Sequence, residues 1–235
     1  MKPKCWRCGR GIGCPDCIRT GLNGRSFILN RSAVTYDTQM KEWLAQYKYR
    51  GNERYAPLLI EMMLRVYTML HREANIHLGN KGSRNSSNVP WSVHAVTSVP
   101  VSGERLQERG FNQAEVLAQG LALRIKVPYV RLLERRRHTD KQSFKNRMDR
   151  LKDMKGVFGA LQDAPDMLLS ISSQVAECTG SPAGTPRIKG PFRILLIDDI
   201  YTTGSTINAC AQVLRRYESL VEMPIEIYSL TWARS

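Results

Sequence analysis

The chain has 235 residues, 42% of them hydrophobic, which suits one substantial α/β domain with a small appendage. Lys and Arg number 35 against 21 Asp and Glu, and the resulting net charge of +14 favours polyanionic partners. A basic charge that only keeps the protein in solution is the alternative. No stretch approaches the roughly 20 apolar residues of a membrane span. No apolar signal core follows Met1, so we expect a cytoplasmic location.

The first predicted element is a cysteine module over residues 1–24. It contains two Cys-x-x-Cys pairs, formed by Cys5, Cys8, Cys14 and Cys17. In a cytosolic protein such pairs indicate a metal site before they indicate disulfides, and four thiolates can close a tetrahedral zinc shell with Zn–S distances of about 2.3 Å. Only five residues separate the pairs, against about 15–20 in zinc ribbons. A compressed structural Zn²⁺ site is therefore predicted, with a redox dithiol as the alternative and fortuitous spacing as the least favoured interpretation.

Residues 25–235 are expected to form the main domain. Residues from about 27 to 73 have the pattern of a strand followed by apolar-striped helices, and 93–100 that of a first core strand. Asn112 is placed to cap the helix that follows, and 224–232 alternates like a closing strand. Two stretches rich in Gly, Ser or Pro are predicted to be flexible insertions, at about 79–90 and 162–190.

The positive charge concentrates between Arg131 and Lys155, where ten Lys or Arg stand against four Asp or Glu, a net of +6. A loop of this charge can track a nucleic-acid backbone or grip pyrophosphate through charge-assisted hydrogen bonds. A solvated charged loop is equally compatible with the composition. The candidate nucleic-acid-binding residues are Arg135, Arg136, Arg137, Lys141, Lys145 and Arg147.

The most informative segment runs from Ile194 to Thr206. Four apolar residues predict a strand buried on both faces of a parallel sheet, and Asp198 and Asp199 follow at its carboxyl end, where ligands bind in open α/β sheets. Residues 202–206 then form a turn into a helix, where backbone N–H groups favour an anion such as phosphate. Gly204 is expected to provide close backbone approach or a positive φ angle. Two carboxylates beside a phosphate cradle suggest a sugar phosphate, whereas a buried strand with an acidic turn is the plainer alternative.

This segment resembles the phosphoribosyl-pyrophosphate (PRPP) motif of type I phosphoribosyltransferases. The resemblance implies a fold of that type, a parallel sheet flanked by helices, here with a small N-terminal zinc-finger-like module of four cysteines. It assigns Asp198 and Asp199 to the ribose hydroxyls as the catalytic pair. The residues that it assigns to the 5′-phosphate are Thr202, Thr203, Gly204, Ser205 and Thr206.

A second string narrows the resemblance. The Val-Pro at 99–100 is followed by Arg105 and then by Arg-Gly-Phe-Asn-Gln at 109–113. Together with the cysteine pairs and the Lys-Tyr-Arg-Gly stretch at 48–51, this string resembles the ComF family of competence proteins, which serve DNA uptake in natural transformation. The family often spaces its cysteine pairs more widely. In the stretch at 48–51, a phosphate role for Lys48 or Arg50 and a solvated face are equally favoured.

The resemblance implies that the protein binds PRPP or a related phosphate ligand with Mg²⁺, binds single-stranded DNA, and has a competence helicase as a partner. The alternative is an active phosphoribosyltransferase that transfers phosphoribosyl from PRPP to an unidentified nitrogenous acceptor. In that reaction Arg105 and Arg109 would grip pyrophosphate and Mg²⁺ would neutralise its charge. A non-catalytic scaffold that keeps the motif for ligand sensing is a third interpretation.

Overall fold

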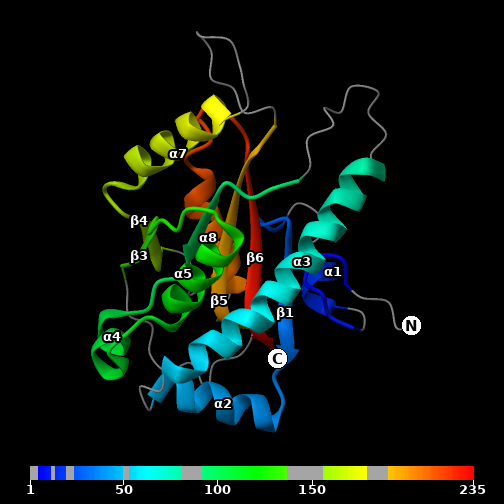
Figure 1. The fold of residues 1–235 in the computed structure, drawn as a ribbon, viewed down its shortest axis with the longest axis vertical. Helices are drawn as coiled ribbons and strands as arrows, with labels where there is room; N and C mark the ends of the chain where they lie inside the picture. Colours follow the sequence, from blue (N-terminus) through cyan, green and yellow to red (C-terminus); the bar gives the residue numbers. More distant parts are fainter. Residues whose placement is uncertain are drawn as a thin grey trace.

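A four-stranded parallel sheet runs through the middle of the molecule (Figure 1). The computed structural model describes residues 5–11, 14–19, 24–49, 53–80, 91–136, 156–178 and 190–235. The sheet has the order β1-β6-β5-β2. Its strands are β1 (Leu29–Thr35), β2 (Ala95–Ser98), β5 (Phe192–Tyr201) and β6 (Ile225–Arg234). The predicted α/β class with a parallel sheet between helices is confirmed.

Helices cover both faces of this sheet. One face packs against α2 (Thr38–Tyr49), α3 (Ala56–Asn80) and α5 (Gln113–Ile125), and the other against α7 (Ala164–Cys178) and α8 (Ser205–Arg215). The remaining elements are α1 (Pro15–Arg19), the 3-10 helix η1 (Glu53–Tyr55), α4 (Gly103–Arg109) and an antiparallel hairpin of β3 (Leu133–Arg135) and β4 (Phe158–Ala160). Among the described residues, no helix combines the length and the apolarity that crossing a membrane requires.

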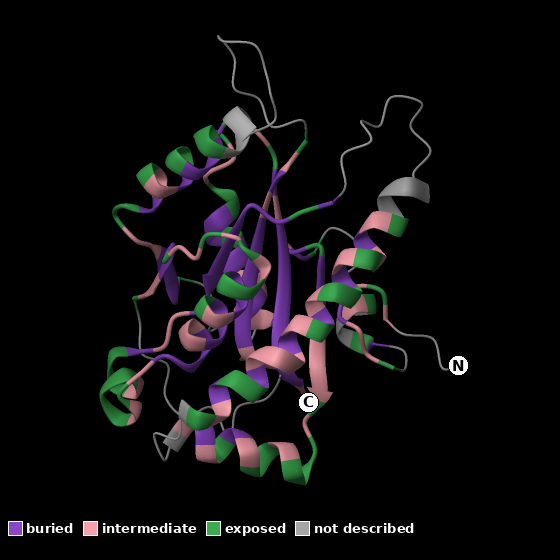
Figure 2. Ribbon diagram, in the orientation of Figure 1, coloured by how far each residue is buried: buried purple, intermediate pink, exposed green. Residues whose placement is uncertain are grey.

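The β5 strand is buried on both sides, as its uninterrupted apolar run predicted (Figure 2). Ile194 and Leu196 pack in the core layer that contains α7 and α8, whereas Leu195 and Ile197 pack in the layer that contains α3 and α5. All four side chains are completely buried. The strand is therefore fixed from both faces, which gives the carboxylates that follow a rigid support.

The predicted start of α5 is also confirmed. The Asn112 side chain accepts a hydrogen bond from the backbone N–H of Ala114 at 3.1 Å and donates one to the Val99 carbonyl, also at 3.1 Å. It thereby satisfies an N–H that has no partner within the helix and ties α5 to the chain leaving β2. The helix carries its apolar stripe into the core through Leu117 and Leu121.

The two predicted insertions are partly wrong. The stretch 162–190 contains the regular helix α7, because Ala164, Leu168 and Ile171 recur at helical spacing and are buried in the core cluster that also contains residues of β5 and α8. Its serines do not break the helix, since Ser172 and Ser173 both donate back to the Leu169 carbonyl. In the stretch 79–90 the first two residues belong to α3. The parts at 81–90 and 179–189 lie outside the described residues.

Two strand predictions also need correction. The strand expected at 93–100 covers only Ala95–Ser98 and lies at one end of the four-strand order, after β1 in the chain. The strand expected to close the sheet at 224–232 lies between β1 and β5. This place follows from the short crossover through α8, which returns the chain parallel to β5 and beside it.

Candidate functional site

The acidic pair lies where β5 loses its neighbour on one side. The last pair of residues between β2 and β5 is Ser98 and Ile197, so the edge of β5 is uncovered at the next residue, Asp198. On the other side Asp198 still pairs with Thr231 of β6. A crevice at the carboxyl end of parallel strands, where a neighbour turns away, is the usual place for ligands in such sheets. A cavity of about 150 Å³ opens there and is lined by both carboxylates.

Lys48, at the end of α2, forms an ion pair with Asp199. Both side chains are largely buried, with 13% and 19% of their surfaces exposed. From the sequence, Lys48 could either contact phosphate or lie on a solvated face. The structure places it in the lining of the cavity. Its neighbour Arg50 lies outside the described residues.

Three arginines share the cavity with Lys48 and the acidic pair. Arg105 and Arg109 come from α4, and Arg135 comes from β3. The guanidinium of Arg109 donates to the Gln113 side-chain oxygen at 2.8 Å, which holds it beside the start of α5. Cationic side chains therefore outnumber the acidic ones in the cavity lining, and the surplus of positive charge suits an anionic ligand that also carries hydroxyls.

The two carboxyl groups have opposite pKa shifts. Burial, followed by the charge of its neighbour, raises the pKa of Asp198 to about 8. Burial also acts to raise the pKa of Asp199, but the Lys48 ammonium and then the Arg109 guanidinium outweigh it and hold that pKa below its ordinary value. The pair therefore carries about one negative charge at neutral pH, and Asp198 can hold or release a proton there.

Substituting Asp198 by Asn is expected to stabilise the ligand-free protein. Because the pKa of Asp198 is raised from 3.8 to about 8 by folding, the folded state retains a proton that the unfolded chain loses, and stability falls as the pH rises from about 4 to about 8. Asn cannot ionise, so the gain should grow over this window and reach on the order of 2 kcal/mol at pH 8.

Urea unfolding at pH 5 and pH 8 measures this gain. Asp199→Asn is the matched control with the opposite sign, because it leaves the largely buried Lys48 without its partner and should destabilise. A gain in Asp198→Asn that is absent, or equal at both pH values, would contradict the pKa assignment.

The turn after β5 has the features expected of an anion-binding loop. Gly204 adopts φ +77° and precedes α8 without a side-chain cap, which leaves N–H groups of the first helical turn for solvent or a bound anion. The Thr203 hydroxyl lies 3.0 Å from that of Ser205. Thr203 is buried and Thr202 is exposed, while Thr206 lines the same cavity as the acidic pair. Of the five predicted loop residues, the structure thus brings Thr206 into the cavity that the two carboxylates line, whereas the other four are not part of its lining.

The predicted nucleic-acid-binding residues are only partly described. Arg135 lies in β3, is partly buried, and stacks over the Phe158 ring at 5.6 Å. Arg136 is exposed and pairs with Glu134 at 2.7 Å. The other four candidates, Arg137, Lys141, Lys145 and Arg147, lie outside the described residues. The distribution of charge along the chain does not show that Arg135 lines the cavity of the acidic pair.

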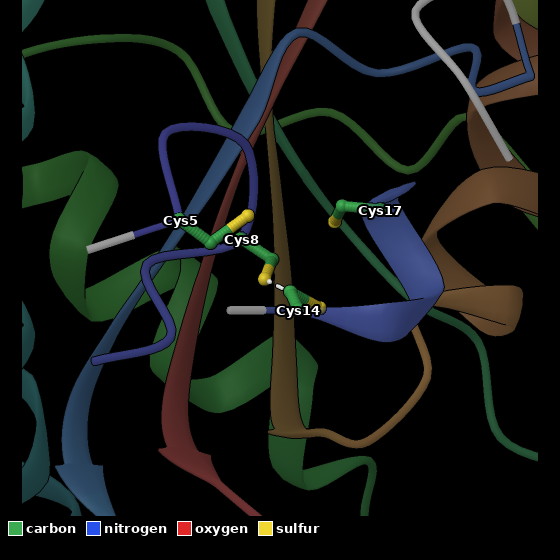
Figure 3. A group of neighbouring side chains, drawn as sticks. All are labelled: Cys5, Cys8, Cys14 and Cys17. Carbon is green, nitrogen blue, oxygen red and sulfur yellow. Dashed lines mark hydrogen bonds between the residues drawn. The ribbon is translucent and has the colours of Figure 1, made fainter. Parts of the chain in front are cut away.

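The four N-terminal cysteines converge as a metal site requires (Figure 3). Their sulfur atoms all lie within 4.8 Å of one another, and Cys8 Sγ lies 3.5 Å from Cys14 Sγ. Four Zn–S bonds of about 2.3 Å at tetrahedral angles place sulfurs roughly 3.8 Å apart, so the cluster fits one Zn²⁺. The spacing of five residues is therefore no obstacle. A hydrogen bond from Cys17 lowers the pKa of Cys8 to about 4, which favours the thiolate that a metal binds.

The cysteine module is packed on the main domain. Cys8 and Cys14 are buried in the same core cluster as Phe27 and Tyr201. Backbone contacts join the module to the sheet as well, because Asn30 of β1 donates to the Arg7 carbonyl at 2.6 Å. Cys210, which lies outside this cluster, is fully buried in α8, as expected of a small apolar side chain.

A second cavity, of about 430 Å³, lies between the cysteine module, β1 and α3. It contains neither the carboxylate pair nor the loop, and its one acidic side chain, Glu73, pairs with Arg31 at 2.6 Å. The smaller cavity holds the convergent charges and Thr206 from the turn after β5, so it is the candidate site.

Three curated proteins are similar to this chain, whereas no protein-family model matches it. Competence protein ComFC of Bacillus subtilis (strain 168) is 29% identical over 217 residues, which cover 89% of this chain and 70% of that protein. Competence protein ComFC of Streptococcus pneumoniae is 26% identical over 216 residues, covering 86% and 73%. Competence protein F of Haemophilus influenzae is 29% identical over 124 residues, covering 52% and 44%.

Proposed function

The chain belongs to the ComF family of competence proteins, and we propose that it serves DNA uptake by binding PRPP, or a related phosphate ligand, together with Mg²⁺ and single-stranded DNA. The observation that carries the ligand proposal is the shared cavity of the acidic pair and Thr206, the last residue of the anion-binding loop. In it, carboxylate oxygens can accept from ribose hydroxyls, while the N–H groups at the start of α8 face a 5′-phosphate.

Magnesium fits this cavity as a companion of the ligand. Carboxylate and phosphate oxygens are the ligands that Mg²⁺ prefers, and it keeps several waters beside one or two protein carboxylates. Asp198 and Asp199 could supply the protein oxygens, and Arg105 and Arg109 would stand beside the pyrophosphate. Mg²⁺ would neutralise charge on the phosphates. Lys48 forms an ion pair with Asp199 in the structure. A Mg²⁺ ion that binds the Asp199 carboxylate must therefore displace the Lys48 ammonium.

The DNA part of the proposal rests on the basic segment 131–155 and on the names of the relatives. Backbone contacts by Lys and Arg give affinity that is independent of sequence and falls steeply with salt. Arg136 is exposed at the start of this segment, as a phosphate-contacting residue should be. A competence helicase as partner and a location in the cytoplasm complete the proposal.

Two titrations on the same variants test the proposal. PRPP with Mg²⁺ should bind the intact protein, and binding should weaken at least a hundredfold in Asp198→Asn/Asp199→Asn. A labelled single-stranded oligonucleotide should keep its affinity for that variant within threefold. Arg135→Gln/Arg136→Gln/Arg137→Gln should lose about tenfold or more in DNA affinity at 100 mM salt, with a shallower salt dependence. If the intact protein does not bind PRPP, the ligand proposal is wrong. If its affinity for DNA does not change with salt concentration, the proposed contact between the basic segment and the DNA backbone is wrong.

One observation favours catalysis as a second candidate function. The pKa of Asp198, raised to about 8, lets this carboxyl exchange a proton at neutral pH beside the ionised Asp199. In a phosphoribosyltransferase, an acceptor nitrogen forms a bond to the anomeric carbon as the bond to pyrophosphate breaks. Asp198 could take the proton that this nitrogen releases. PRPP-dependent release of pyrophosphate across a panel of nitrogenous bases distinguishes the two functions, because a ligand-sensing protein releases none.

A further inference from the structure

Arg25 is a buried cation beneath the anion-binding loop. Arg25 precedes β1 in the chain, and only 9% of its surface is exposed. One guanidinium nitrogen donates to the Thr203 carbonyl at 2.9 Å, and the group lies over the Phe27 ring at 5.5 Å. Its Nε is buried and has no hydrogen-bond partner among the described residues. No motif in the sequence marks Arg25, and the family resemblance assigns it no role.

A second polar group points at the same place. The Tyr201 residue is 2% exposed, and its hydroxyl is also buried without a hydrogen-bond partner in the described part of the chain. A side chain added to Gly204 would run into both the Tyr201 hydroxyl and the Arg25 guanidinium. Two polar groups with unused hydrogen-bonding capacity therefore converge on the glycine at the centre of the loop.

The Arg25 guanidinium forms no ion pair among the described residues. Two other arginines that are buried to a similar degree, Arg31 and Arg193, each pair with a glutamate, at 2.6 and 3.0 Å. Arg25 has no such carboxylate partner among the described residues, and it stands at the N-terminus of the eleven-residue helix α8, which is itself electropositive. Burying a cation beside a positive helix end is unfavourable unless an anion balances it.

We infer that Arg25 is a specificity-determining residue, which makes the Thr202–Thr206 loop select doubly charged phosphate monoesters over singly charged phosphate diesters. This inference rests on the proposed function of the loop. Arg25 lies behind the backbone of the loop and acts through it, by holding the Thr203 carbonyl and by adding a full positive charge to that of the α8 terminus. The Coulomb energy between Arg25 and the ligand is proportional to the charge of the ligand. The logarithm of the factor by which Arg25 raises the affinity should therefore be twice as large for a dianion as for a monoanion.

The test compares two ligands of different charge at one pH. At pH 8, ribose 5-phosphate is a dianion because its second pKa is near 6, and the monomethyl ester of its phosphate is a monoanion. Isothermal titration should show Arg25→Gln weakening ribose 5-phosphate binding by roughly thirtyfold and binding of the methyl ester by roughly fivefold. Arg25→Lys, which keeps the charge, should keep the ratio of the two affinities within threefold of the intact protein. The control Arg124→Gln removes an exposed arginine paired with Glu61 on α3, and should change neither affinity by more than twofold.

Each outcome decides between a charge effect and a structural effect. Equal weakening of both ligands in Arg25→Gln would show that Arg25 only shapes the loop, and would overturn the inference while leaving the phosphate site intact. If the intact protein binds neither ligand, the proposed function itself fails. If Arg25→Gln does not fold, as judged by its thermal melt, Arg25→Lys decides, because an affinity ratio that collapses although the charge is kept contradicts the inference.

Discussion

Replacing Cys8 by serine is expected to remove zinc from the protein and to lower its free energy of unfolding by about 3 kcal/mol or more. A structural zinc ion stabilises the folded state directly, because the unfolded chain does not present four aligned thiolates. Cys8 and Cys14 are also buried in the main core cluster, so the loss reaches beyond the module. For a chain of this length the loss corresponds to a decrease in melting temperature of roughly 10 °C.

Metal analysis of the purified protein and thermal melts before and after chelation check this prediction. The intact protein should contain one zinc per chain, and a chelator should lower its melting temperature to near that of Cys8→Ser. Cys210→Ala is the matched control, because it removes a fully buried cysteine outside the cluster and should leave the zinc content unchanged. A metal-free protein whose melting temperature responds to reductant and not to chelator would favour the redox dithiol.

The contacts between the module and the sheet extend the effect of zinc loss beyond the module. Arg234, at the end of β6, donates to the Cys8 carbonyl at 3.0 Å, and its guanidinium lies 4.8 Å from the centre of the Tyr201 ring. Tyr201 in turn ends β5 and lies beneath the anion-binding loop. Loss of the metal should therefore loosen the packing of Tyr201 beneath the loop as well as the cysteine module.

The parts of the fold that follow from local pattern were predictable. The run Ile194–Ile197 has the composition of a strand buried on both faces, and the glycine and hydroxyl residues after it have that of a turn, so both elements follow from neighbouring residues alone. The cysteine cluster was predictable for the same reason, since its ligands lie within thirteen residues of sequence.

The parts of the site that depend on packing between distant segments were not predictable. Lys48 meets Asp199 because α2 ends near the open edge of β5, about 150 residues away in the sequence. Arg135 lines the same cavity because a short hairpin places it there, whereas the charge of its sequence neighbours left a nucleic-acid contact, a pyrophosphate contact and a solvated loop all open. The helix α7 was missed for a different reason, because the serines and prolines around it hid a local pattern of three apolar residues at helical spacing.

Substituting Gly204 by alanine should weaken PRPP binding at least thirtyfold. The backbone at this position has φ +77°, which costs an L-residue roughly 1–2 kcal/mol. The new methyl group would also collide with the Tyr201 hydroxyl and the Arg25 guanidinium, both of which are buried and have little room to move. The loop should therefore shift, and the N–H groups at the start of α8 should lose their common direction.

Calorimetry with PRPP and Mg²⁺, together with thermal melts, measures this loss. Tyr201→Phe removes the colliding oxygen but leaves the ring carbon Cζ at 2.6 Å and the Arg25 guanidinium at 2.5 Å from the new methyl carbon, so the double variant with Gly204→Ala should recover only a small part of the lost affinity. Gly103→Ala is the control, because a methyl group there has no atom within 4 Å and stands at the start of α4. Unchanged PRPP affinity in Gly204→Ala would mean that the phosphate group is bound away from this turn. The Arg25 guanidinium beneath it would then be a structural residue, since the charge that it contributes can select a ligand only if the loop above it holds the phosphate.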